Sequence, residues 1–541
     1  NNAEDTRWLD ATAQAELIST RAATSTELVD ASIERIEQLD GPINAVIMRW
    51  FDRARHQAEA FDELPVESEH RNGAFAGVPF LLKDLHNHVA GMPLTSGNRA
   101  ARDDTPLSTH DSNLVVRFRD AGLITLGRTN SPDFGSVPVT EPLAYGPTRN
   151  PWNTDHTPGG SSGGAAAAVA AGMVPIAHAS DGGGSIRIPA SCSGLVGLKP
   201  SQGRVSMGPE RDESGLSTQL CVSRSVRDTA RMLDAVHRPG VGDSVIAPAP
   251  SRPYVDELGV DPGRLRIGLL DRHPIGGDLH PDCVTAVRAA AGLLEGLGHD
   301  VSLGHPPILE DAEFPRRFAA MWAALMAVGI DALGQTLGRR LTADDVEPVN
   351  WAQGEYASQL SAAQYAMALA AVGQYRRQVQ GWWADGWDLL LTPTLAAPPL
   401  PIGGLYGDQG DGIDPDNPMA PSIRSGRFVA FTPQFNASGQ PAISLPLHWN
   451  DDGLPIGVQL VAAYGREDVL IRIASQLEAA APWADRRPTC NGGIRFGDDL
   501  GSDRAGPAGG AGHGVRLVLR SGAYDAVVAD RSRARCPLRG S

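Results

Sequence analysis

The chain has 541 residues and a formal net charge of −16, with 42% hydrophobic and 20% charged residues. These proportions are typical of a globular protein with a large core. The acidic balance excludes the broad basic surface that binds nucleic-acid phosphates, so we expect no nucleic-acid partner.

Cysteine usage and the apolar stretches exclude several further classes. Five cysteines are scattered without a CxxC pair or a neighbouring His cluster, so the sequence predicts no disulfide framework, no metal site and no cofactor. The first residues are polar and acidic, unlike a signal peptide. The longest apolar stretch, 165–179, is mostly alanine and too short to cross a bilayer. We therefore expect a cytoplasmic protein with no membrane partner.

The first half of the chain contains clear helix and strand signals. Thr24 and Glu27 form a capping-box pattern ahead of residues 29–39, whose apolar positions fall on one helical face. An apolar strand is predicted at 77–84. A slim, alanine-rich helix is predicted in the run that ends at residue 172.

The second half alternates strands with helices. A strand, a helix and a strand within 265–303 predict a βαβ unit, and therefore a sheet with parallel parts. Residues 315–386 have a helical pattern, and a short buried strand follows at 388–392. Residues 441–447 and 455–461 predict two strands around a turn.

The last stretch, 487–541, differs in composition. It is rich in Gly, Arg and Asp and has little hydrophobic periodicity. We interpret it as a disordered or non-native tail without a functional role.

Lysine is almost absent from this sequence. Of the 47 basic residues only Lys83 and Lys199 are lysines. An arginine does not deprotonate in a protein, whereas a buried lysine can become neutral and act as a base. Lys83 stands at the end of the predicted strand at 77–84, where burial would lower its pKa.

Two glycine-rich segments surround serines. One is Pro-Gly-Gly-Ser-Ser-Gly-Gly at 158–164, and the other is Ser-Asp-Gly-Gly-Gly-Ser-Ile-Arg-Ile-Pro at 180–189. Successive backbone amides without side chains can form an anion nest directly before a serine. Such amides can hold the oxyanion that forms when the serine attacks a carbonyl.

These segments resemble the amidase signature family, and the resemblance extends from near residue 8 to about 485. It implies a catalytic triad of Lys83 as base, Ser161 as the serine with a cis peptide bond, and Ser185 as nucleophile. The spacing between the two serines also matches the family pattern. The resemblance implies hydrolysis of carboxamide bonds through an acyl-enzyme.

The resemblance also implies supporting groups and a fold. The expected oxyanion hole consists of the backbone amides of Gly182, Gly183, Gly184 and Ser185. The expected supporting residues are Ser162, Asp181 and Arg187. The expected fold class is α/β, with a single large domain at 8–486 whose twisted mixed sheet is covered by helices on both sides.

The substrate is expected to be a small, uncharged amide with alkyl or aryl groups, including oligoamides. A carbamate (urethane) remains open, and so does a homodimer. We expect the pocket wall within residues 314–387, an apolar segment with few polar groups. Its candidate wall residues are Met321, Trp322, Met326, Tyr375, Trp382 and Trp383.

Other functions fit parts of the same sequence. The same signature occurs in the amidotransferase subunit that supplies ammonia to misacylated tRNA, and in aryl acylamidases. Gly159-x-Ser161-x-Gly163 also fits a nucleophile elbow with His178 or His448 as base, but no apolar strand precedes it. Lys199, before a proline, is expected in a structural ion pair. An intact Lys83, Ser161 and Ser185 argue against a catalytically dead binding module.

Overall fold

Eleven strands form one mixed sheet within the described residues, which are 2–212, 215–414 and 416–488 of the computed structural model. The strand order is β1-β3-β2-β4-β6-β5-β10-β11-β9-β7-β8. The strands are β1 (Val46–Arg49), β2 (Pro79–Lys83), β3 (Ile124–Thr129), β4 (Ile176–Asp181), β5 (Val196–Lys199), β6 (Thr218–Ser223), β7 (Arg266–Leu269), β8 (Asp300–Leu303), β9 (Leu389–Pro393), β10 (Ala442–Trp449) and β11 (Pro455–Ala462).

The helices are of very different lengths. They are α1 (Asn2–Asp5), α2 (Ala11–Ser19), α3 (Ser25–Ile43), α4 (Phe51–Asp62), α5 (Arg99–Asp104), α6 (Asn113–Asp120), α7 (Gly163–Ala170), α8 (Arg187–Ser193), α9 (Val226–Val236), α10 (Pro281–Gly296), α11 (Phe314–Thr336), α12 (Pro348–Ser358), α13 (Ala362–Ala384), α14 (Ala420–Phe428), α15 (Pro433–Ser438) and α16 (Glu467–Ala480). Short 3₁₀ turns lie at η1 (Glu69–Asn72), η2 (Asp133–Gly135), η3 (Tyr254–Glu257) and η4 (Pro307–Glu310).

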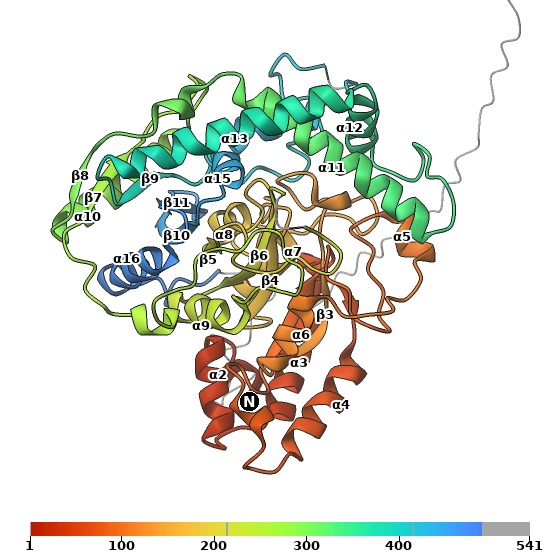
Figure 1. The fold of residues 1–541 in the computed structure, drawn as a ribbon. Helices are drawn as coiled ribbons and strands as arrows, with labels where there is room; N and C mark the ends of the chain where they lie inside the picture. The colour runs from red at the N-terminus through yellow and green to blue at the C-terminus, as the bar shows by residue number, and fades with distance from the viewer. Residues whose placement is uncertain (1, 213–214, 415, 489–541) are drawn as a thin grey trace, which may run out of the picture. The chain divides into compact units, whose positions relative to one another are not determined.

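The sheet is buried on both faces at its centre. Every residue of β2, β4, β5, β6, β9 and β11 is buried, so both faces of these strands are covered. Helices α7 and α8 contact the central strands, and α9, α10 and α16 contact β5, β6 and β9 to β11. Helices α11, α12 and α13 lie together at the top of Figure 1, away from the N-terminal helices. The predicted α/β class with a helix-covered mixed sheet is confirmed.

Several local predictions are confirmed. Thr24 caps α3, and its capping box with Glu27 is formed. The predicted βαβ unit is β7, α10 and β8, with β7 and β8 parallel. The two predicted C-terminal strands are β10 and β11, which pair antiparallel.

The alanine run at 165–179, which we expected to be too short to cross a bilayer, is buried throughout. It forms α7, whose eight residues are all buried in the core. Within the described residues, α11 is the one helix long and apolar enough to cross a bilayer, and 33% of its apolar window is buried. It packs against α12 and α13, and its aromatic face lines the cavity described below.

The expectation for the tail at 487–541 falls almost wholly outside the described residues, which end at Pro488.

Candidate active site

Lys83 ends β2 and contacts Ser161, which lies in the segment before α7, and Ser180 of the neighbouring parallel strand β4. Strand β2 pairs in parallel with β4 through Leu81 and Ala177, so the carboxyl ends of both strands lie at one edge. The Lys83 Nζ donates hydrogen bonds of 2.7 Å to Ser161 Oγ and 2.9 Å to Ser180 Oγ. Ser180 precedes the last residue of β4, so that strand holds the amine from one side.

The Lys83 side chain is fully buried. Burial lowers the pKa of Lys83 to about 7, although the negative charge of Asp181 acts in the opposite direction. A substantial fraction of Lys83 is therefore neutral near neutral pH, as a general base requires.

Ser161 follows a cis peptide bond between Gly160 and Ser161, as expected. The next residue, Ser162, bonds to β4 twice: its Oγ donates to Ser180 O and accepts from Ser180 N, both at 3.2 Å. Helix α7 then begins at Gly163. Ser162 thus ties the start of α7 to the strand that carries the second glycine segment.

Ser185 lies in the turn between β4 and α8 and is 7% exposed, at the wall of a cavity. The Asp181 carboxylate accepts from the backbone N–H of Gly184 at 2.8 Å and of Ile186 at 3.2 Å. It therefore holds the turn on both sides of Ser185. Gly184 has a φ of +134°, and a side chain there would collide with Thr432 Oγ1, so only glycine fits.

The hydrogen bond from Gly184 corrects one predicted role. Its N–H donates to the Asp181 carboxylate and is therefore not free to bind an oxyanion. Within the described residues, no acceptor is bonded to the N–H groups of Gly182, Gly183 or Ser185. These three amides are free to receive a negatively charged oxygen.

Arg187 is fully buried and supports the turn between β4 and α8 through Asp181. It donates two hydrogen bonds of 3.0 Å to the Asp181 carboxylate. Burial disfavours the charged form of Asp181, but the charge and hydrogen bonds of Arg187 and a hydrogen bond from Asn436 outweigh it and lower the pKa to about 2. Asp181 is therefore an ionised brace across the working pH range.

Three partners of this cluster were missed by the sequence analysis. Arg187 also donates to Asn436 Oδ1 at 2.7 Å, to Gln459 Oε1 at 2.8 Å and to the carbonyl of Thr432 at 3.0 Å. All three lie far along the chain, and no local pattern marks them. The one available signal in the sequence was Arg187 itself, because an arginine among apolar residues needs several hydrogen-bond acceptors if it is buried.

A cavity of about 630 Å³ opens at Ser185. Its wall comes from α11, α14, the loop after η2 and the loop at 273–277. The wall is mainly apolar and includes Val137, Ile188, Leu309, Phe314, Phe318 and Trp322. The charged wall residues Asp311 and Arg427 are each paired with an opposite charge, Arg317 and Asp411 respectively.

Only one of the predicted wall residues lines this cavity. It is Trp322. The other five, Met321, Met326, Tyr375, Trp382 and Trp383, are buried in the core instead. Phe314, Phe318 and Trp322 repeat every four residues along α11, but Met326 continues this series and Met321 lies two helical turns after Phe314. Helical spacing alone therefore does not separate the residues that line the cavity from the two buried methionines.

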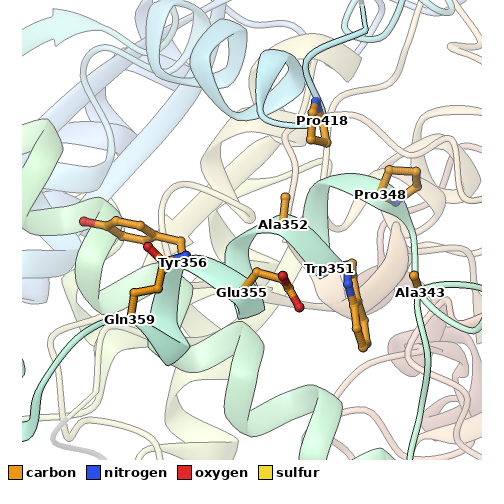
Figure 2. A pocket seen from close by; sticks show the side chains of 8 residues that line it. All are labelled: Ala343, Pro348, Trp351, Ala352, Glu355, Tyr356, Gln359 and Pro418. Carbon is orange, nitrogen blue, oxygen red and sulfur yellow. The ribbon is translucent and has the colours of Figure 1, made fainter. Parts of the chain in front are cut away.

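A separate hollow of about 410 Å³ lies on α12 and shares no lining residue with the cavity at Ser185. Figure 2 shows its side chains, among them Trp351 and Glu355 of α12 and Pro418 of the facing segment. It contains no serine and no lysine, so the chemistry belongs to the other cavity.

The remaining candidate bases are engaged elsewhere. Lys199 is buried, and its Nζ donates to the carbonyl of Pro200 at 2.8 Å; the ion pair expected for it is not formed among the described residues. Burial, followed by the charge of Arg187, lowers the pKa of Lys199 to about 7. His178 lies against Asn87 and Gln219, so the nucleophile-elbow hypothesis lacks this base. In the described part of the chain, no group of three or more His, Cys, Asp or Glu residues could hold a metal ion.

The fold, the lysine-serine contact and the free amides beside Ser185 define a serine amidase. The amidase family model matches residues 27–471, and the chain belongs to this family. It is 44% identical to the 6-aminohexanoate-cyclic-dimer hydrolase of Paenarthrobacter ureafaciens over 488 residues, which cover 89% of this chain and 96% of the relative.

Solved structures agree with this assignment. The structure of a 6-aminohexanoate cyclic dimer hydrolase matches with a TM-score of 0.84 and 42% identity, covering 90% of this chain and 99% of that one. A bacterial aryl acylamidase of the amidase signature family matches with a TM-score of 0.78 and 28% identity, covering 88% and 97%. The protein is an enzyme, an amide hydrolase closely related to the cyclic dimer hydrolases.

Proposed function

We propose that this enzyme hydrolyses uncharged amides with alkyl or aryl groups, and that the cyclic dimer of 6-aminohexanoate and related oligoamides are its substrates. The observation that carries the proposal is the wall of the cavity at Ser185. That wall is mainly apolar, and its charged residues are few: Asp311 is paired with Arg317, and Arg427 contacts Asp411, which also pairs with Arg424. A charged substrate would lose much of its hydration against such a wall.

The proposed mechanism uses the three predicted residues. Neutral Lys83 accepts the proton of the Ser161 hydroxyl, and Ser161 accepts that of Ser185 as Ser185 Oγ attacks the carbonyl carbon. The amides of Gly182, Gly183 and Ser185 hold the oxyanion. The same relay returns a proton to the leaving nitrogen, and water then releases the acid from the acyl-enzyme.

The cyclic dimer suits this cavity because it carries no charge. Its ring holds two secondary amides joined by methylene chains, which match an apolar wall. Hydrolysis of one amide adds water and produces a linear chain with an ammonium and a carboxylate. The gain of two charges favours release of the product from an apolar cavity.

A second candidate substrate class is aryl amides and carbamates. The rings of Phe318 and Trp322 stack at 5.6 Å with an interplanar angle of 20°, and both line the cavity. Such a wall offers a flat surface to an aromatic ring. One structural relative is an aryl acylamidase, which agrees with this candidate.

A substrate panel tests the proposal. The purified enzyme is assayed with the cyclic dimer, an anilide, an aryl carbamate and glutamine, and kcat/KM is compared. We expect the cyclic dimer or the anilide to exceed glutamine by more than about tenfold, because glutamine carries two charges into the apolar cavity. A tenfold preference for glutamine would contradict the proposal and favour the amidotransferase function.

The proposal includes a homodimer in the cytoplasm that needs no nucleic acid or membrane. The net charge of −16 supports the independence from nucleic acid, and the free thiols of the described cysteines Cys192, Cys221 and Cys283 support a reducing compartment such as the cytoplasm. Light scattering after size-exclusion chromatography tests the dimer, and co-sedimentation with liposomes tests the independence from membranes. A monomer, or an enzyme bound to the liposomes, would contradict these parts.

A further inference from the structure

Helix α11 contacts the turn between β4 and α8, here called the oxyanion turn, at Gly182. Gly182 is buried, and Trp322 of α11 lies directly against it. A Cβ atom placed on Gly182 would lie 3.2 Å from Trp322 Cζ3 and 3.0 Å from Ser217 Oγ. On the adjacent Gly183, a Cβ atom would lie 3.4 Å from Phe318 Cζ. The stacked aromatic pair of α11 therefore lies beside Gly182 and Gly183, with little room for a side chain at Gly182 and ordinary contact distance at Gly183.

Backbone conformation does not require glycine at position 182, because Gly182 is not among the residues with positive φ. An alanine there would need a shift of a few tenths of an ångström from Trp322. A threonine has two further heavy atoms and would need Trp322 to move away. The closeness of this tryptophan to the turn is thus a consequence of the missing side chain at Gly182.

We propose that Gly182 and Trp322 together determine which acyl groups the enzyme accepts, admitting groups unbranched at the α carbon and excluding branched ones. The inference rests on the proposed function in placing the substrate's carbonyl oxygen at the amides of Gly182 and Gly183. The proposal also places the carbon next to that carbonyl beside Trp322, which lines the cavity and lies against Gly182. A methylene or an aryl plane passes beside the ring, and a branch collides with it.

This selection separates two substrate classes by shape. A 6-aminohexanoyl group is unbranched at its α carbon, whereas the α-carboxamide of every chiral α-amino acid carries a branch there. The side-chain amide of glutamine follows a methylene group, so this selection by shape does not act on glutamine. The aromatic wall would reject the second class even when its charges are removed. Shape at the α carbon and charge are thus independent filters.

The test uses two matched substrate pairs and four enzymes. The pairs are the p-nitroanilides and the primary amides of butanoic acid and of 2-methylpropanoic acid, which differ in branching at the α carbon. The enzymes are wild type, Gly182→Thr, Trp322→Ala and the double variant. We expect wild type to favour the unbranched acyl group by about tenfold or more in kcat/KM, the range that one misplaced methyl group produces in a tight site.

In Trp322→Ala this preference should fall below about threefold, since the wall is removed. Gly182→Thr should lower kcat/KM on the unbranched substrates by more than about tenfold when Trp322 is present. In Trp322→Ala the loss should be at least about threefold smaller, because only Ser217 Oγ then remains close to the new side chain. Such non-additivity identifies a collision between the two positions. An equal loss of kcat/KM from Gly182→Thr in both backgrounds would refute the proposal. An unchanged preference for unbranched acyl groups in Trp322→Ala would also refute it, and so would inactivity of the wild type on both unbranched substrates.

Trp351→Ala is the matched control. Trp351 lines the separate hollow on α12 (Figure 2), so its removal should leave the branch preference unchanged. Melting temperatures of all variants check folding. The branch preference can be judged separately from the substrate panel. An enzyme that is inactive on the cyclic dimer but keeps its preference for unbranched acyl groups would contradict the proposed substrate and support this inference.

Discussion

Thr432 Oγ1 donates a hydrogen bond of 2.7 Å to the carbonyl oxygen of Gly183, which lies 249 residues earlier in the chain. The peptide of Gly183 is thereby held from the side opposite to Asp181. Residues on both sides of Thr432 line the cavity at Ser185, so the bond connects the cavity wall to the oxyanion turn. The orientation of this turn depends on a contact that no part of the glycine motif contains.

Replacing Thr432 with valine should test that contact, because valine keeps the shape and removes the donor. We expect kcat to fall by about 3- to 10-fold with little change in KM, as for loss of one neutral hydrogen bond that orients a reacting group. Thr432→Ser retains the hydroxyl and should stay close to wild type. Equal kcat in wild type and Thr432→Val would show that the turn keeps its orientation unaided.

Ser185→Ala should abolish hydrolysis with the fold intact, since no other hydroxyl is proposed to form the acyl-enzyme. Intact-mass analysis with a fluorophosphonate should show one adduct, and peptide mapping should place it on Ser185. An adduct on Ser161 or Ser162 would reverse the assignment of nucleophile and relay.

Lys83→Arg should be as inactive as Lys83→Ala. A guanidinium remains charged at working pH and does not accept the proton of Ser161. Steady-state assays of both variants, with circular dichroism as a check of folding, measure this. Activity above about a tenth of wild type in Lys83→Arg would mean that the amine acts through its charge.

The pH profile should report the same residue. Because the pKa of Lys83 is lowered to about 7, its neutral form is lost as pH falls below that value, and kcat/KM should drop about tenfold per pH unit. The pKa of Lys199 is also lowered to about 7, but its amine contacts only the carbonyl of Pro200 among the described residues. Lys199→Met should therefore leave the acidic limb of the pH profile unchanged. A shift of that limb in Lys199→Met would show that Lys199, and not Lys83, produces it.

Glu347 should lower stability at high pH. Burial, followed by the charge of Asp133, raises its pKa to about 7, above the value of 4.5 for an unperturbed glutamate. The folded state therefore binds the proton more tightly than the unfolded state, and stability is lost as pH rises from about 4.5 through about 7. Glu347→Gln does not ionise and retains the acceptor for Leu143 N–H. Above pH 7 it should be more stable than wild type, on the order of 2 kcal/mol, and the gain should vanish near pH 4 in urea unfolding.

Treatment with EDTA should leave activity unchanged, since the described residues contain no group that could hold a metal ion. Dialysis against the chelator followed by assay measures this. Loss of activity that a divalent ion restores would contradict the metal-free mechanism.

The sequence analysis was most accurate where the signal was local. The capping box of Thr24 and the strand that ends at Lys83 depend on neighbouring residues, and both are present. The wall of the cavity was predicted poorly, because a helix with apolar residues on several faces does not show which face meets a cavity. Trp322 and Met321 are adjacent in sequence, yet one lines the cavity and the other is in the core.

The braces of the oxyanion turn were beyond local patterns altogether. Asn436 and Gln459 reach Arg187 from α15 and β11, more than 240 residues away. Their position depends on how β11 is placed in the sheet, which is a property of the whole fold. The oxyanion role predicted for the Gly184 amide failed for a related reason, since this N–H donates to Asp181 only in the folded turn.

The burial of both lysines has a practical consequence. Lys83 and Lys199 are 0% and 1% exposed and are the only lysines of the chain, so the native surface presents no ε-amine. Succinimidyl dyes and amine-directed cross-linkers would find these side chains only after the structure opens. The rate at which the ε-amines become labelled would therefore follow unfolding itself, with no engineered probe.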